Sequence, residues 1–137
     1  MEELGGLLDI RDVTEQILKL DERIRYVAIL NLQYCLLASK MRQGLSSLTP
    51  TQTDRDFLEV VTPLMVDSAG KLKPFCGAIK RITVLYDKVL LTLYRTAVHL
   101  VVLSLEPGVE QTLLDKIGGA VRKLELSDAK DEDTETP

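Results

Sequence analysis

Cysteine, histidine and aromatic residues are scarce in this chain. Its 137 residues include no tryptophan, two cysteines and a single histidine. Cys35 and Cys76 are far apart and form no C-x-x-C pair, so the four ligands of a zinc site are hard to assemble. We therefore predict no metal site and no cofactor. Both cysteines are flanked by apolar residues, which predicts free, buried thiols in a reducing compartment.

The sequence also lacks the motifs of nucleotide-binding and hydrolytic enzymes. Gly70-Lys71 is followed by Leu72, whereas a phosphate-binding loop needs serine or threonine there to hold magnesium. No G-x-G-x-x-G, G-x-S-x-G or H-E-x-x-H sequence is present. The only histidine, His99, lies in an apolar run, which indicates a hydrogen-bonded core residue; a contact in a ligand pocket is the alternative. We predict that the protein is not an enzyme and has no catalytic residues.

Long hydrophobic runs and a basic leader are missing too. The first residues include acids, unlike the basic start of a signal peptide. The longest apolar stretch, Val89 to Leu105, contains Arg95 and His99 near its middle and is shorter than the ~20 apolar residues of a membrane-spanning helix. We therefore predict a cytoplasmic protein with no membrane insertion.

Charge is distributed unevenly along the chain. The net charge is −4, but residues 125–137 hold six acidic residues and one lysine, which leaves the remainder with a net charge of +1. Such an acidic segment repels itself and has little apolar surface to bury. The predicted organisation is an N-terminal extension at 1–8, a single domain at 9–124 and a disordered acidic tail at 125–137.

Apolar residues at helical spacing predict three helices. They cover residues 9–24, residues 54–73 and a segment that follows Pro107-Gly108. Asp9 is a suitable N-cap for the first helix. Pro63 is expected to kink or split the second helix, because proline cannot donate the helical hydrogen bond.

Runs of β-forming residues predict five strands, at residues 25–32, 35–41, 78–86, 89–94 and 97–105. The last run is apolar on both faces, as expected of a central strand. The order α-β-β-α-β-β-β-α predicts an α+β fold, with a five-stranded antiparallel sheet and helices on both faces. Gly118-Gly119 in the last helix lowers helix propensity and permits close packing.

Two short motifs mark the first third of the chain. One is L-D-x-x-I-R, and the other is M-R-x-G; their residues are Leu20, Asp21, Ile24 and Arg25, then Met41, Arg42 and Gly44. The element order resembles that of the Roadblock (dynein light-chain) family and its profilin-like and longin-like relatives. The motifs look like those of small uncharacterised proteins of ammonia-oxidising archaea, whose first hairpin usually has glycine where this chain has Gln33-Tyr34. The resemblance implies homodimers or heterodimers that scaffold or regulate Ras-like small GTPases.

The strand at 78–86 is predicted to lie at a sheet edge beside the second helix. An unpaired edge can pair with a second copy of itself across a two-fold axis, which would bring the two copies of the helix together. The predicted homodimer interface consists of Phe57, Val61, Leu64, Met65, Ile82, Thr83 and Val84.

A basic set in the second half is the other candidate site. It consists of Lys71, Lys73, Lys80, Arg81 and Lys88, with Arg95 nearby and Asp87 as the single acid among them. These residues could contact an acidic partner, the acidic tail or nucleic acid, or they could protect an edge strand from aggregation. The nearly neutral domain and the absence of a nucleic-acid motif argue against nucleic acid.

Two hypotheses for the function follow. The first is a non-enzymatic, dimeric adaptor or regulator, with a small GTPase as the candidate partner. The alternative is a small-molecule sensor, because related folds hold ligands between the sheet and a helix. A packed core favours the first hypothesis, whereas a cavity near His99 favours the second.

Overall fold

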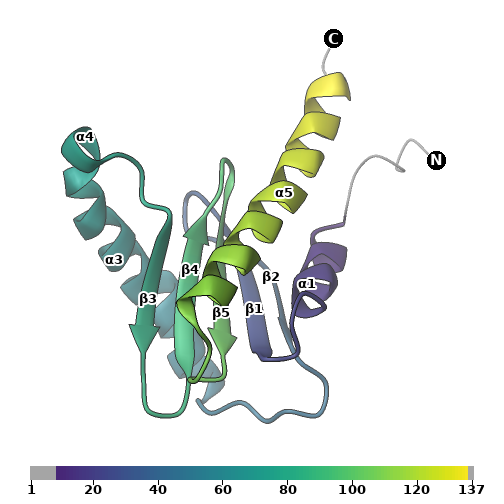
Figure 1. Ribbon diagram of the computed structural model, residues 1–137, viewed down its shortest axis with the longest axis vertical. Helices are drawn as coiled ribbons and strands as arrows, with labels where there is room; N and C mark the ends of the chain where they lie inside the picture. Colours follow the sequence, from purple (N-terminus) through teal and green to yellow (C-terminus); the bar gives the residue numbers. More distant parts are fainter. Residues whose placement is uncertain (1–8, 136–137) are drawn as a thin grey trace.

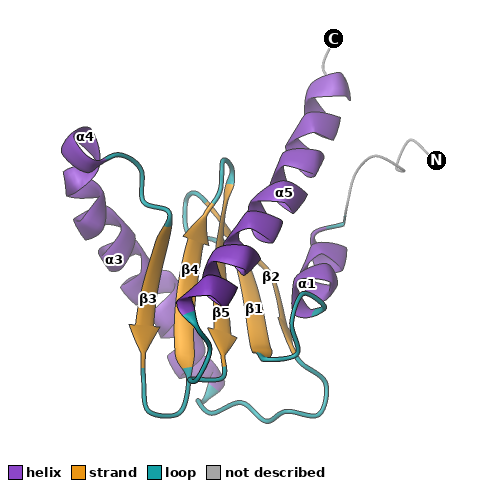
Figure 2. Cartoon of the chain, viewed as in Figure 1, coloured by secondary structure: helices purple, strands orange, loops and turns teal. Residues whose placement is uncertain are grey.

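The computed structural model describes residues 9–135, with side chains as far as Leu124. Five antiparallel strands form one sheet in the order β2-β1-β5-β4-β3 (Figures 1 and 2). They are β1 (Ile24–Asn31), β2 (Leu36–Met41), β3 (Arg81–Leu85), β4 (Leu90–Arg95) and β5 (His99–Leu105). The predicted α+β fold and element order are confirmed. As predicted, β5 is the central strand, and all its residues except His99 and Ser104 are buried.

Helices α1 (Ile10–Leu18) and α5 (Gln111–Glu135) cover one face of the sheet (Figure 1). Their apolar stripes pack on alternate strand residues in a first core, which includes Ile17, Val27, Tyr94, Leu103, Ile117 and Val121. Asp9 is the N-cap of α1, as predicted, and its carboxylate accepts a hydrogen bond from the Arg11 N–H at 2.9 Å. The predicted extension of this helix to Ile24 is wrong, because Ile24 begins β1 and is fully buried there.

Arg42 fixes the connection between α1 and the sheet. Its guanidinium donates to the carbonyl oxygens of Leu18, Asp21 and Ile24 at 2.5, 2.8 and 2.7 Å. The Leu18 carbonyl belongs to the last turn of α1, where carbonyls lack helical donors. Arg23 donates to the Asp21 carboxylate at 2.9 and 3.0 Å, and this hydrogen bonding is the main cause that lowers the pKa of Asp21. Both sequence motifs therefore supply structural contacts at this corner.

One long helical segment, residues 51–76, covers the opposite face (Figure 1). It consists of α2 (Thr51–Asp56), a π-helical turn (Phe57–Val61), α3 (Thr62–Ala69), a 3-10 turn (Gly70–Leu72) and α4 (Lys73–Cys76). Its inner side contributes Leu58 to a second core, whose strand residues are Ala28, Leu30, Leu93, Leu100 and Val102. Pro63 does not split this segment: the wider π-helical turn precedes it, and the Thr62 hydroxyl donates back to the Phe57 carbonyl at 3.1 Å. The segment ends before Gly77, whose φ is +90°.

The backbone of α5 continues to Glu135, into the acidic segment predicted to be disordered. The domain boundary at residue 125 and the disorder of residues 125–137 stay predictions. The predicted N-terminal extension at 1–8 lies outside the described residues.

Both cysteines are free, as predicted, but they are exposed rather than buried. Cys35 follows the β1–β2 turn, and Cys76 is the last residue of α4. The apolar residues that flank each cysteine in the sequence therefore lie at the end of a helix or strand. Between residues 9 and 135, no helix has the length and apolarity to cross a bilayer. In the same part of the chain, no three acidic, histidine or cysteine side chains are grouped as metal ligands.

Candidate functional site at the β3 edge

β3 lies at the edge of the sheet, as predicted, and pairs with β4 alone. The Tyr86 N–H donates to the Val89 carbonyl at 2.9 Å, and hydrogen bonding alternates along an antiparallel pair. The N–H groups of Thr83 and Leu85 therefore point away from β4, toward the open side. An edge of this kind can accept a further strand.

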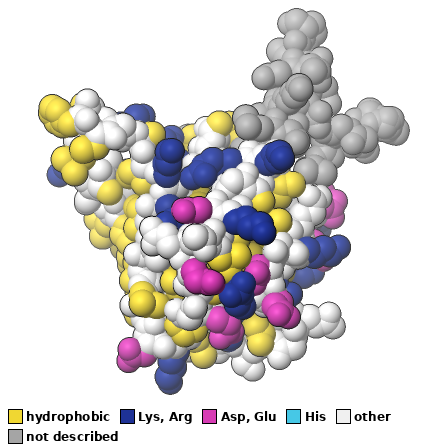
Figure 3. All heavy atoms as spheres, in the orientation of Figure 1, with side chains coloured by type: hydrophobic (Ala, Val, Ile, Leu, Met, Phe, Trp, Pro, Cys, Tyr) yellow, Lys and Arg dark blue, Asp and Glu magenta, His cyan; other side chains and the backbone are white. Residues whose placement is uncertain are grey.

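The neighbouring helical segment exposes several large apolar side chains. Leu64 on α3 is 63% exposed and Phe75 on α4 is 85% exposed, and Val60, Val61 and Leu72 are exposed as well. Figure 3 shows apolar side chains at the tip formed by α4. Monomeric proteins rarely leave large apolar patches in water, so this surface is a candidate interface.

The residues of the predicted dimer interface fall into three groups. Val61, Leu64 and Thr83 are exposed; Met65 and Val84 are half-buried; Phe57 and Ile82 pack against the second core of their own molecule. The π-helical turn explains the difference, because it holds more residues than an α-helical turn and rotates the apolar stripe. The outward part of the predicted set is therefore Val61, Leu64 and Thr83.

The prediction missed the exposed side chains of Val60, Phe75 and Leu85. Phe75 carried a usable signal in the sequence: one of only two phenylalanines lies between Pro74 and Gly77, where a helix is about to end. An aromatic side chain at such a position has no long apolar stripe to join. Val60 carried no such signal, because its exposure depends on the π-helical turn.

The basic set is spread along β3 rather than gathered at one point. Its members at residues 71–80 precede the strand, whereas Lys88 lies in the β3–β4 turn at the opposite end. Arg81 forms an ion pair with Asp115 of α5 at 2.5 Å and so links the edge strand to the first helical layer. This spacing is typical of edge protection. A role of the set in partner binding stays a prediction.

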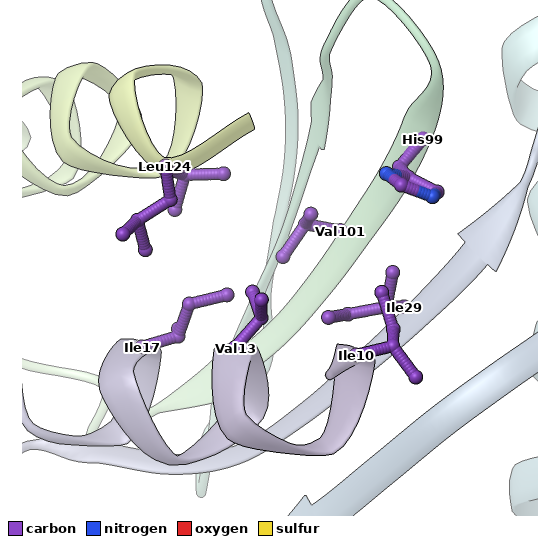
Figure 4. A pocket seen from close by; sticks show the side chains of 8 residues that line it. Ile10, Val13, Ile17, Ile29, His99, Val101 and Leu124 are labelled. Carbon is purple, nitrogen blue, oxygen red and sulfur yellow. The ribbon is translucent and has the colours of Figure 1, made fainter. Parts of the chain in front are cut away.

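His99 lines a small cavity between α1, α5 and the sheet (Figure 4). Its volume is about 20 Å³, which is room for roughly one water molecule. The other lining residues are apolar: Ile10, Val13, Ile17, Ile29, Val101, Val121 and Leu124. A ligand pocket at His99, where the sensor hypothesis placed it, therefore has no space. The His99 backbone N–H is bonded to the Thr96 hydroxyl at 3.1 Å.

A larger cavity of about 340 Å³ lies between the sheet and the end of the helical segment. One of its walls is Tyr34, in the turn between β1 and β2. Tyr34 has φ +67°, in the left-handed region that costs a residue with a side chain about 1–2 kcal/mol. Its hydroxyl donates to the Asp67 carboxylate of α3 at 2.8 Å. Burial, followed by this hydrogen bond, raises the pKa of Tyr34.

The chain has the fold of Roadblock/LC7 domains. The gliding protein MglB of Thermus thermophilus has 14% sequence identity and a TM-score of 0.61, over 93% of this chain and 95% of that chain. MglB in a tetrameric arrangement has 15% identity and a TM-score of 0.67, over 94% and 96%. The Roadblock/LC7 domain from Streptomyces avermitilis has 10% identity and a TM-score of 0.64, over 85% and 93%. No family model and no curated protein matches the chain. The resemblance to the Roadblock family predicted from the element order is thus confirmed at the level of the fold, whereas the likeness of the motifs to archaeal proteins is not supported by these matches.

Proposed function

We propose that the protein is a non-enzymatic, homodimeric adaptor or regulator in the cytoplasm that acts on a Ras-like small GTPase. The proposal of a dimer rests on one observation: the open β3 edge lies beside exposed apolar side chains of the helical segment. The GTPase is supported by the Roadblock fold, because the family resemblance links this fold to such partners. Self-association is also described for one protein of this fold, MglB in a tetrameric arrangement.

In the proposed dimer, β3 of each copy pairs antiparallel with β3 of the other. The two sheets then become one, and the exposed parts of the helical segments meet over the seam. The N–H groups of Thr83 and Leu85 gain acceptors, and Val61 and Leu64 leave water. The ion pair of Arg81 with α5 reduces the charge that two adjacent β3 strands would bring together.

Light scattering at ~100 μM, where an interface of standard size holds, tests the dimer. The wild type should have the mass of two chains. Thr83→Pro should yield monomers without unfolding, because the lost N–H points to the open edge and proline is tolerated on edge strands. A monomeric wild type would contradict the proposal.

The second edge of the sheet offers a matched control. The Arg42 N–H donates to the Arg25 carbonyl at 2.8 Å, and the same alternation turns the N–H of Ser39 outward on β2. Ser39→Pro should therefore keep the dimer. If Ser39→Pro gives monomers and Thr83→Pro does not, the pairing edge is β2.

The GTPase partner is tested with immobilised protein in native extract supplied with GDP or a non-hydrolysable GTP analogue. Mass spectrometry should find a small GTPase bound to the wild type. Recovery of other proteins but no GTPase under either condition would contradict the regulator role. Pure protein should release no phosphate from GTP or ATP; release that Lys71→Ala abolishes would contradict the non-enzymatic role.

A further inference from the structure

The larger cavity is lined by both apolar and charged residues. Its apolar walls are formed by Leu32, Val66, Ile79 and Leu100, and its polar atoms come from Tyr34, Asp67, Lys73 and Arg95. Its volume of about 340 Å³ is at the lower end of ligand pockets, which span roughly 300–1,000 Å³. We propose that this cavity binds a small amphipathic carboxylate, with the carboxylate at Arg95 and Lys73 and the apolar part between sheet and helix. The proposal is independent of the dimer and of the GTPase.

Arg95 determines the sign of the ligand's charge. It continues the row of β4 side chains that includes Leu93 and faces the helical segment. Among the residues that the structure describes, neither Arg95 nor Lys73 has an ion-pair partner. A planar guanidinium at an apolar surface matches the two oxygens of a carboxylate.

Asp67 limits the ligand to a single negative charge. Two cations and one carboxylate border the cavity, so the surplus is one positive charge. A dianionic phosphate would be repelled by Asp67, whereas a monocarboxylate balances the surplus. The apolar walls then favour a ligand with a hydrocarbon part over a small polar acid.

Gly70 borders the cavity and places no side chain in it. Val66, Gly70 and Lys73 recur at helical spacing along the face that borders the cavity. The φ of Gly70 is −65°, an ordinary helical value, so the backbone does not require glycine there. A Cβ at Gly70 would meet no atom within 4 Å. Glycine weakens a helix, and at this position its effect is to leave space open.

Tyr34 forms one wall of the cavity, and its backbone is strained. The turn is held by Asn31, whose side-chain oxygen accepts from the N–H groups of Gln33 and Cys35 at 2.9 and 3.0 Å. The bond from the Tyr34 hydroxyl to Asp67 then joins this turn to α3. Strained residues that the surroundings hold in place are concentrated at ligand sites. The strain here places an aromatic ring at the cavity wall.

Octanoate is the probe for this site, with octan-1-ol and octylammonium as neutral and cationic controls. In ¹H–¹⁵N NMR titrations of the full chain at pH 7, octanoate should shift the amides of Tyr34, Gly70 and Arg95 saturably. Octan-1-ol should bind more weakly and octylammonium should not bind. Absence of saturable shifts with octanoate, or equal binding of all three compounds, would overturn the proposal.

Two variants separate the apolar and charged parts of the site. Gly70→Met should fill the cavity and abolish binding, whereas Gly119→Met, a helical glycine with open space around its Cβ, should leave it unchanged. Arg95→Gln should weaken octanoate about tenfold and leave octan-1-ol unchanged, because only the carboxylate loses a partner. The exposed Lys123→Gln is the charge control. Octanoate binding that survives both Gly70→Met and Arg95→Gln would overturn the proposal, even if one of the two variants were unstable. Light scattering of the same samples reports the dimer separately.

Discussion

A Cβ on Gly118 would lie 2.7 Å from Cε1 of Tyr94. The tyrosine is buried beneath α5, and its hydroxyl donates to the carbonyl of Leu114, one helical turn earlier, at 2.7 Å. Because Gly118 has no side chain, α5 approaches the sheet closely enough for this bond to form. The adjacent Gly119 faces open space.

The two glycines should respond to alanine in opposite directions. Gly118→Ala should lower the free energy of unfolding by about 1–3 kcal/mol, because the ring and the helix must separate. Gly119→Ala should raise it by up to about 1 kcal/mol, because alanine is the better helix former. Urea denaturation followed by circular dichroism measures both. The same sign for the two variants would contradict the close packing.

The close packing at Gly118-Gly119 was predictable from the sequence, but not which glycine makes the contact. The strands were predicted nearly to their ends because alternation and burial are local signals. Helix α1 was predicted too long because Ile24 satisfies both a helical spacing and the start of a strand. The bond from the Tyr34 hydroxyl to Asp67 joins residues thirty-three positions apart, so no local pattern predicted it. The missing hairpin glycine was the one local sign of an unusual turn at Tyr34. The open β3 edge followed from the topology, whereas the inward orientation of Phe57 depended on the π-helical turn.

Arg42→Met should lower the free energy of unfolding by about 2 kcal/mol, because it leaves carbonyls at the α1–β1 corner without their charged donor. Chemical denaturation measures the change. Arg55→Met is the control, since Arg55 is exposed on α2. An equal effect of the two substitutions would mean that the Arg42 bonds add nothing to stability.

The stability should depend on pH through Asp21. Its pKa is lowered in the folded state, mainly by the Arg23 side chain. The stabilisation is therefore present above the unfolded pKa, about 4, and is lost as pH falls through the lower folded value. Urea denaturation between neutral and acidic pH should show a steeper loss for the wild type than for Asp21→Asn. Arg23→Gln should flatten the profile in the same range, and an unchanged slope in both variants would contradict the assignment.

Removal of residues 127–137 should leave the domain folded. The segment is rich in acids and has little apolar surface to bury, so its loss should change the melting temperature by no more than about 2 °C. Differential scanning calorimetry of the truncated chain is the measurement. A larger decrease would show that the acidic segment binds the domain, and loss of that decrease in high salt would point to the basic set.

Leu64 distinguishes the proposed dimer from an ordinary exposed surface. It is 63% exposed on α3, and Leu48, in the loop before α2, is 55% exposed. In an isolated monomer, neither side chain has much burial to lose, so Leu64→Glu and Leu48→Glu should be equally harmless. In the dimer, two copies of Leu64 enter the seam, where an unpaired carboxylate is costly.

Leu64→Glu should therefore shift the protein to monomers at ~100 μM, whereas Leu48→Glu should remain dimeric. Because association stabilises the folded state by mass action, the melting temperature should rise with concentration for the wild type and for Leu48→Glu, but not for Leu64→Glu. Light scattering and calorimetry over a range of concentrations measure both effects. Unchanged mass and the same concentration dependence in all three proteins would exclude α3 from the interface.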